Sequence, residues 1–202
     1  MTLSEKIQIP LFPLSVFLLP GERTQLHIFE PRYRQLFEEL EHGDSSFGIP
    51  FLQNSLNGRF GSRCRLIRVL KRYNSGESDV LIESDGIFQL SEFNPIKEGK
   101  LYPYGTVILK RDLIKELASN EVIGAYDDLD TSLSGTDLHI HVGHSPFLLI
   151  LMANMGLSHE DKYAFIQLPD AEARNKSLLG RIKLLDHLVK QEKATEHGIY
   201  LS

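Results

Sequence analysis

The chain has 202 residues, of which 42% are hydrophobic, and its formal net charge is −5. A chain of this length buries roughly 70% of the surface that it exposes when unfolded, so a substantial core is expected and disorder is not. The acidic balance gives no overall attraction to DNA or to an anionic membrane, which makes a soluble partner the expected one.

The sequence contains a single cysteine, Cys64. It allows neither an intrachain disulfide nor a cysteine-based zinc site, as is typical of a reducing compartment. The apolar stretch at residues 7–19 contains two prolines and is not followed by an A-x-A-like cleavage site, so we predict folded chain rather than a signal peptide. The apolar run at residues 147–155 is far shorter than the ~20 residues that cross a bilayer. We therefore expect no membrane span and a cytoplasmic location.

Up to about Arg111 the sequence consists of short apolar pieces separated by Gly, Pro, Asn and Ser, a pattern typical of strands. In KRYNSGESDVLIE, the turn residues Asn74, Ser75 and Gly76 separate two strand-like runs and predict a hairpin. The strands that we predict are residues 7–12, 15–19, 24–29, 46–52, 62–73, 79–83, 86–93 and 104–111.

One helix interrupts these strands. Residues 31–41 place Tyr33, Leu36, Phe37 and Leu40 at helical spacing, and Pro31 suits the first helical position because its missing N–H would have no partner there.

After Arg111 the apolar spacing becomes helical. Residues 112–126 predict a helix, and the polar stretch DDLDTSLSGTD, residues 127–137, predicts a mobile loop. Three further helices are expected to begin at the caps Ser145, Ser158 and Asp170. The sequence thus predicts an α+β fold, with a β-rich unit at residues 1–111 and a helical subdomain at residues 112–202.

The stretch LHIFEPRYR gathers several charged side chains where a strand meets a helix. His27 and Glu30 would suit an acid/base pair, because His titrates near neutrality and a carboxylate can hold its tautomer. No nucleophile motif accompanies them. The favoured interpretation is structural: Glu30 meets the positive end of the helix dipole, and Arg32 and Arg34 brace the loop through hydrogen bonds.

A second candidate is LHIHVGH, in which His139, His141 and His144 together with Asp137 would suit a metal site. A solvated polar loop is the favoured interpretation, because the spacing is unspecific.

A third candidate is RFGSRCRLIRVLKRY, residues 59–73, which has six basic residues and no acid. On a strand, Arg63 and Arg65 share one face while Arg68 and Arg72 share the other, so the charges do not form one phosphate track. Ion pairing with the acidic helical half and solvation is favoured over RNA or DNA binding.

Several catalytic motifs are missing from the sequence. It has no GxxxxGK[ST], GxGxxG, HExxH, CxxC or GxSxG pattern, which argues against ATP hydrolysis and dinucleotide chemistry. Cys64 is interpreted as a small buried residue.

IPLFPLSVFLLPGERTQLHIFEPRYRQL closely resembles the opening signature of the substrate-binding N-terminal domain of Lon proteases. FGIPF, GSRCRLIRV and MGLSHEDKYAFIQLPDAEARNKSLLGRI are similar to later segments of the same domain, so the resemblance spans nearly the whole chain. The signature residues here are Pro20, Gly21, His27, Glu30, Pro31, Arg32, Tyr33 and Arg34. In IESDGIFQL the chain has Ser84 and Ile87 where the family usually has Gly and Arg.

The resemblance implies a PUA-like pseudo-barrel with a helical subdomain packed behind it. In the full-length proteases an ATPase module and a Ser-Lys protease module follow, and neither motif occurs in this sequence. The resemblance therefore implies a stand-alone, non-catalytic module without cofactor or metal. Its expected partners are unfolded or degron-bearing proteins and peptides, or a regulatory protein. An exposed apolar patch and open strand edges are the expected binding features. An RNA-binding PUA-like module that uses Arg63 and Arg65 is the alternative.

Overall fold

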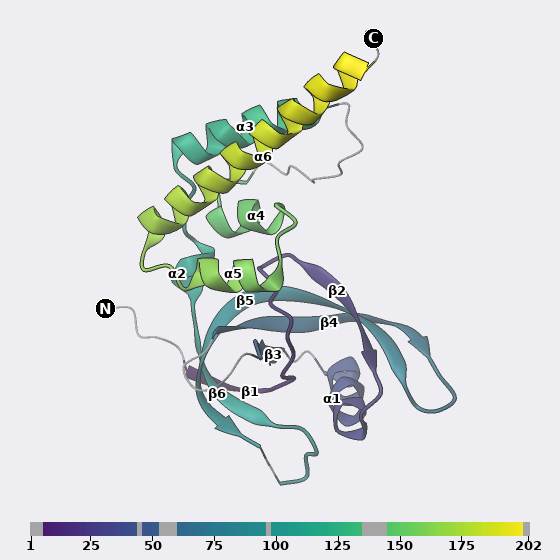
Figure 1. The fold of residues 1–202 in the computed structure, drawn as a ribbon. Helices are drawn as coiled ribbons and strands as arrows, with labels where there is room; N and C mark the ends of the chain where they lie inside the picture. The colour runs from purple at the N-terminus through teal and green to yellow at the C-terminus, as the bar shows by residue number, and fades with distance from the viewer. Residues whose placement is uncertain (1–5, 44–45, 53–59, 96–97, 135–144, 200–202) are drawn as a thin grey trace.

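The fold is described by a computed structural model, which places residues 6–43, 46–52, 60–95, 98–134 and 145–199. The strands are β1 (Lys6–Pro10), β2 (Arg23–Ile28), β3 (Phe47–Pro50), β4 (Phe60–Arg72), β5 (Ser78–Asn94) and β6 (Tyr104–Leu109). The helices are α1 (Pro31–His42), α2 (Arg111–Ile114), α3 (Asn120–Leu133), α4 (Leu148–Ala153), α5 (His159–Ile166) and α6 (Ala171–Ile199). Figure 1 shows α1 beside the curved sheet and the other helices gathered on another side of it. The predicted α+β class is confirmed.

The strands form one antiparallel sheet that closes on itself. Its order is β1-β6-β5-β4-β3, and β2 pairs with β5 outside this order. Just after β1, parallel bridges from Leu11 to Gly48 and from Leu14 to Phe51 join the first part of the chain to the far edge of the sheet. The expected pseudo-barrel is therefore confirmed, because the two edges of the sheet meet.

The long strand β5 holds the sheet together. Its first half pairs with β2 and β4, and its second half pairs with β4 and β6. The prediction of two strands, 79–83 and 86–93, is wrong because the chain continues through Ser84, Asp85 and Gly86 without a break. The register shifts here, since Arg63 pairs with Gly86 and Cys64 pairs with Ser84, and the resulting β-bulge accommodates Asp85.

The hairpin between β4 and β5 and the helix α1 follow the predictions. Gly76 has φ +84° in the hairpin turn, a conformation that glycine adopts without steric cost. In α1, which begins at Pro31, the four predicted apolar residues are all buried. The helix thereby covers part of the barrel core.

The segment between β6 and α4 differs from the prediction. The helix predicted at 112–126 is two helices, because Ser119 caps a new helix by accepting a hydrogen bond from Val122 N. The predicted loop at 127–137 is helical as far as Leu133, Ser134 ends the helix, and residues 135–137 lie outside the described residues. The buried residues of α3 are Val122, Tyr126, Leu129 and Leu133. Their helical spacing outweighs the polar composition of the stretch.

The start of α4 also differs from the prediction, whereas the other two caps are confirmed. Helix α4 begins at Leu148 instead of directly after Ser145, because Ala118 N donates to Pro146 O and Leu148 N donates to Glu116 O. These two bonds hold the chain extended where the sequence predicts the first turn of a helix. Ser158 accepts from Asp161 N, and Asp170 accepts from Ala173 N.

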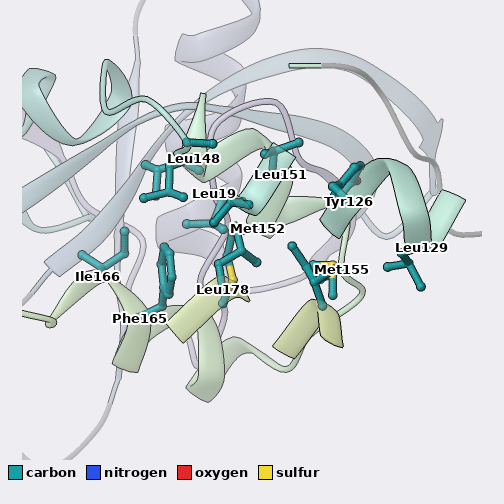
Figure 2. Close-up of a cluster of buried hydrophobic side chains, with 14 of the residues drawn as sticks. Leu19, Tyr126, Leu129, Leu148, Leu151, Met152, Met155, Phe165, Ile166 and Leu178 are labelled. Carbon is teal, nitrogen blue, oxygen red and sulfur yellow. The ribbon is translucent and has the colours of Figure 1, made fainter. Parts of the chain in front are cut away.

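The largest buried cluster contains residues from both halves of the chain. Figure 2 shows it around Met152, where side chains of α3, α4, α5 and α6 meet Leu19 from the N-terminal half. Phe17, Phe51 and Ile87 also belong to this cluster. One hydrophobic core thus contains residues from both sides of the predicted boundary at 111/112. The division of the chain there stays a prediction.

Residues 11–22, which we name the crossing segment, connect the two halves. Phe17 and Leu19 are buried with the helices, while Phe12 and Leu18 are buried in the barrel cluster. The prediction of a strand at 15–19 is wrong, because these residues pack into the two hydrophobic cores and form no strand.

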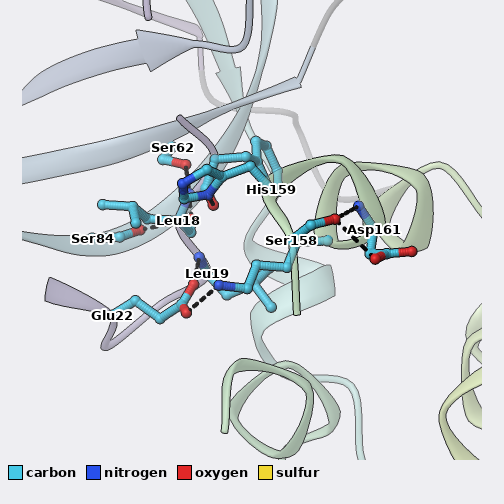
Figure 3. A network of polar contacts seen from close by, with 10 residues as sticks. Leu18, Leu19, Glu22, Ser62, Ser84, Ser158, His159 and Asp161 are labelled. Atoms are coloured by element: carbon cyan, nitrogen blue, oxygen red, sulfur yellow. Dashed lines mark hydrogen bonds and ion pairs between the residues drawn. The ribbon is translucent and has the colours of Figure 1, made fainter. Parts of the chain in front are cut away.

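A polar network holds the crossing segment in place (Figure 3). The Ser62 hydroxyl accepts from Leu18 N at 2.8 Å and donates to Leu18 O at 2.7 Å. The Glu22 carboxylate accepts from Leu19 N at 2.7 Å and from Lys162 Nζ of α5 at 2.5 Å. The side chain of Lys162 is only 7% exposed. The backbone of the crossing segment is thus satisfied by side chains where no ladder is available.

The two departures from the Lon pattern lie beside this network. Ser84 Oγ lies 3.3 Å from Leu18 O, to which it donates, so it adds a contact that glycine cannot make. Ile87 is buried against the helical cluster, a place where an arginine would be desolvated. Ile87 therefore contributes apolar packing at this position.

In the part of the chain that the structure describes, no helix is long and apolar enough to cross a membrane.

We expect Lys162→Met to lower the free energy of unfolding by about 3 kcal/mol, because it leaves the partly buried Glu22 carboxylate without its buried cation. Urea denaturation at neutral pH measures this change. The control is Lys190→Met, which removes a cation that is 60% exposed and paired with Asp186, and should cost less than about 1 kcal/mol. Equal losses in the two variants would contradict the structural role of Lys162.

Two glycines should respond oppositely to alanine. A Cβ at Gly61 would lie 2.3 Å from Cζ of Phe88 and 2.6 Å from Ile49 O, so we expect Gly61→Ala to destabilise the chain by roughly 1–3 kcal/mol. A Cβ at Gly180 of α6 meets nothing within 4 Å, so Gly180→Ala should stabilise by about 0.5–1 kcal/mol. Thermal unfolding of both variants gives the two signs, and a stable Gly61→Ala protein would show that the barrel interior is looser than described.

Candidate functional site

The signature residues form a corner that begins with the turn before β2. Pro20 is buried, and Gly21 follows it with φ +90°. Glu22 N donates to Leu19 O at 3.1 Å, which closes the turn. A turn of this kind requires a positive φ at its third residue, so the Pro-Gly pair is fixed by backbone geometry.

His27, near the end of β2, lies close to two carboxylates of the neighbouring hairpin and is hydrogen-bonded to one of them, that of Asp79. Its Nδ1 lies 2.7 Å from Asp79 Oδ1, and its Nε2 lies 3.6 Å from Glu77 Oε2. The hydrogen bonds from His27 and from the Tyr73 hydroxyl hold the pKa of Asp79 below its usual value. Glu30 bonds to Arg32 instead, so these contacts give no support to an acid/base pair of His27 and Glu30.

The two arginines of the signature differ in what they contact. Arg34 Nε donates to Phe29 O and its Nη1 donates to Ser75 O, each at 2.8 Å, so it ties the strand end to the β4–β5 turn. Arg32 Nε donates to Glu30 Oε2 at 2.8 Å, and its guanidinium lies 4.5 Å from the ring centre of Tyr33. These contacts fit the bracing role that the sequence analysis favours.

A mostly apolar hollow of about 180 Å³ lies at this corner, between the crossing segment and β2. Its floor is buried, with Phe12 packed on Tyr33 at 4.2 Å between ring centres. Phe29 stands at the rim with 56% of its surface exposed. The residues that line the hollow are Phe12, Leu14, Leu26, His27, Ile28, Phe29, Glu30 and Tyr33. The corner therefore presents an apolar surface on a well-braced frame.

The strand β2 has an open edge next to this hollow. Ser84 N donates to Glu22 O, and the ladder continues without a register shift. The residues that exchange hydrogen bonds with β5 are therefore Thr24, Leu26 and Ile28. The N–H and C=O groups of the alternate residues point away from β5 and have no partner among the described residues; these are Arg23, Gln25 and His27.

The arginines proposed for RNA binding are paired with acids. Arg63 Nε lies 2.6 Å from Asp85 Oδ1, and Arg65 Nη2 lies 2.5 Å from Glu83 Oε1, both on β5. Bonds from Arg65 and Arg23 lower the pKa of Glu83. Arg72 pairs with Glu41 of α1. The expectation that this stretch pairs with the helical half is wrong for these arginines, because β5 and α1 supply the acids.

The remaining candidates from the sequence are Cys64 and the histidine-containing stretch at 137–144. Cys64 is fully buried, as predicted, and its burial raises the pKa of the thiol far above the usual value. The histidines at 139, 141 and 144 and the aspartate at 137 lie outside the described residues. Within the described ranges, no group of three or more His, Cys, Asp or Glu side chains is placed to hold a metal ion.

A second hollow, of about 210 Å³, lies in the helical half between α3 and the start of α4. Its described lining residues are Ile123, Tyr126, Asp127, Ser145, Pro146 and Leu151. No strand edge is among these described residues, whereas the corner hollow is bordered by β2.

The apolar lining of the corner hollow is the part of the site that sequence reasoning misses. Leu14, Leu26 and Phe29 look like core residues in the sequence, and only the fold shows that they are partly exposed. A weak signal is present for Phe29, because it falls between the end of a predicted strand and the Glu-Pro that begins a helix.

Comparisons with known proteins agree with this architecture. Residues 8–183 match the family described as "ATP-dependent protease La (LON) substrate-binding domain". A comparison with curated protein sequences found no match.

Two solved structures have a similar fold. A Lon N-terminal domain protein from Xanthomonas campestris has 22% sequence identity and a TM-score of 0.64, over 86% of this chain and 98% of its own. The N-terminal domain of the Mycobacterium avium complex Lon protease has 12% identity and a TM-score of 0.63, over 88% of this chain and 98% of its own. With a family match over most of its length and this fold, the chain belongs to the family of Lon substrate-binding domains.

Proposed function

We propose that this chain is a non-catalytic protein-binding module that recognises unfolded or degron-bearing segments of proteins, or a regulatory protein partner. The family is described as substrate-binding, and the sequence has no phosphate loop with which to hydrolyse ATP. The observation that carries the proposal is the apolar hollow beside the open edge of β2.

The hollow offers burial to an apolar side chain of a partner. Leu14 and Leu26 are half-buried and Phe29 is mostly exposed, so these side chains still have apolar surface to lose to a partner. Each Å² of apolar surface removed from water contributes roughly 25 cal/mol. Unfolded proteins expose such side chains, whereas folded ones mostly bury them, and this difference gives a physical basis for selectivity.

The corner is also rigidly mounted. Arg34 bridges the strand end and the β4–β5 turn, and Tyr33 anchors α1 to the crossing segment. A preformed surface loses little conformational entropy when a flexible partner binds, so more of the burial energy appears as affinity.

The proposal requires no cofactor, metal or membrane. We place the module in the cytoplasm, because its one cysteine is buried and forms no disulfide within the chain.

We expect Phe29→Ala to weaken the binding of an unfolded protein by about tenfold, because it removes the exposed apolar side chain at the rim. The probe is a reduced, carboxymethylated and fluorescently labelled protein, and the readout is its fluorescence anisotropy as the chain is titrated in. Leu184→Ala is the matched control, since Leu184 is 61% exposed but lies on α6, remote from the hollow in the fold.

Both variants should unfold at the same temperature as the unchanged chain, because both side chains are largely exposed. A Phe29→Ala protein that binds the probe as tightly as the Leu184→Ala protein would count against the corner as the binding site. No saturable binding by the unchanged chain would count against the function itself.

A further inference from the structure

We propose that β2 binds its partner by strand addition, and that the segment it takes is extended, with apolar residues alternating with acidic or neutral polar ones. The inference rests on the proposed function and states how the site recognises its ligand. It starts from the backbone of β2, which is hydrogen-bonded on one side only in the described structure.

The unpaired groups have the spacing of a sheet edge. Arg23, Gln25 and His27 direct their N–H and C=O groups away from β5, so three donors and three acceptors stand in one row. An extended chain laid along this row would pair with them as a further strand. These bonds are made by the backbone, so they place no restriction on the identity of the bound residues.

The two faces of β2 differ, and an added strand would share this difference. Thr24, Leu26 and Ile28 turn their side chains inward, and the latter two line the hollow. Every second side chain of an added strand stands on that same face. Those residues should therefore be apolar, because they lie beside Leu26, which lines the hollow.

The outward face of β2 determines the other residues of the ligand. Its side chains are Arg23, Gln25 and His27, and none of them is acidic. The acids near this face are already paired: Glu83 with Arg23, and Asp79 and Glu77 with His27. Glu30, which lines the hollow, is paired with Arg32. A lysine or arginine in the ligand would meet the guanidinium of Arg23, which is 61% exposed, whereas glutamate would be attracted to it.

The test uses a capped, labelled hexapeptide in which valine alternates with glutamate and glutamine. Two derivatives carry N-methyl groups, one on the valines and the other on the polar residues. In any strand these two sets of N–H groups point to opposite sides, so only one set can donate to β2. We expect one derivative to bind at least tenfold more weakly than the parent and the other to bind within about twofold of it.

The direction of the added strand follows from which derivative fails. In an antiparallel arrangement the polar residues donate to β2, and in a parallel arrangement the valines do. Equal affinity of the two derivatives, whether retained or lost, would overturn strand addition. A lysine version of the peptide should bind several times more weakly at low salt, and equal or tighter binding would overturn the stated charge preference.

A variant pair tests the protein side of the same contact. Gln25→Pro removes one N–H from the open edge and none from the ladder with β5, and edge strands tolerate proline there. We expect it to weaken peptide binding about tenfold relative to Gln25→Ala, which also removes the side chain but keeps the backbone N–H. Unchanged affinity in a Gln25→Pro protein of normal melting temperature would overturn the proposal.

The outcomes separate this inference from the function on which it rests. If strand addition fails alone, the unfolded protein still binds with dependence on Phe29, but both N-methylated peptides behave alike. If the proposed function fails, the unfolded protein does not bind at all. The N-methylated peptides need no change in the protein, so they decide the matter even where Gln25→Pro does not fold.

Discussion

Burial of the crossing segment, residues 11–22, is the constraint on which the rest of the structure depends. The segment has little ladder pairing of its own, yet it lies between two hydrophobic cores, with Phe17 facing the helices and Leu18 facing the barrel. Its polar backbone has to be satisfied there, and Ser62 and Glu22 do so. Lys162 then neutralises Glu22 from α5, so the same contact fixes the helical half against the barrel.

The course of this segment also creates the candidate site. After the Pro-Gly turn the chain reverses and returns as β2, which uses one edge for β5 and has no partner strand on the other among the described residues. The hollow lies between the two passes of the chain. Arg34 holds the end of β2 against the β4–β5 turn, so the open edge is presented on a rigid frame. The signature residues thus brace the candidate site, and three of them, His27, Glu30 and Tyr33, also line its hollow.

The sequence predicts local structure well wherever one pattern dominates. The helix from Pro31, the turn at Gly76 and the caps at Ser158 and Asp170 are recognised because each depends on a few adjacent residues. Prediction from the sequence fails where contacts with residues far away in the chain determine the local structure. Asp85 suggests the end of a strand, but a β-bulge against β4 accommodates it within β5. Residues 127–133 have the composition of a loop, but they are helical and bury Leu129 and Leu133. The open edge of β2 is also invisible in sequence, because only the strand order reveals it.

The most direct test of the account is a map of backbone amide chemical shifts of the isotope-labelled chain as a reduced, carboxymethylated protein is added. The account predicts that the perturbed amides concentrate on Phe12, Leu14 and residues 23–30, which surround the hollow, with little change on α6. Perturbations confined to the helical half, or to the arginine stretch of β4, would contradict it, because the partner would then bind a surface other than the corner.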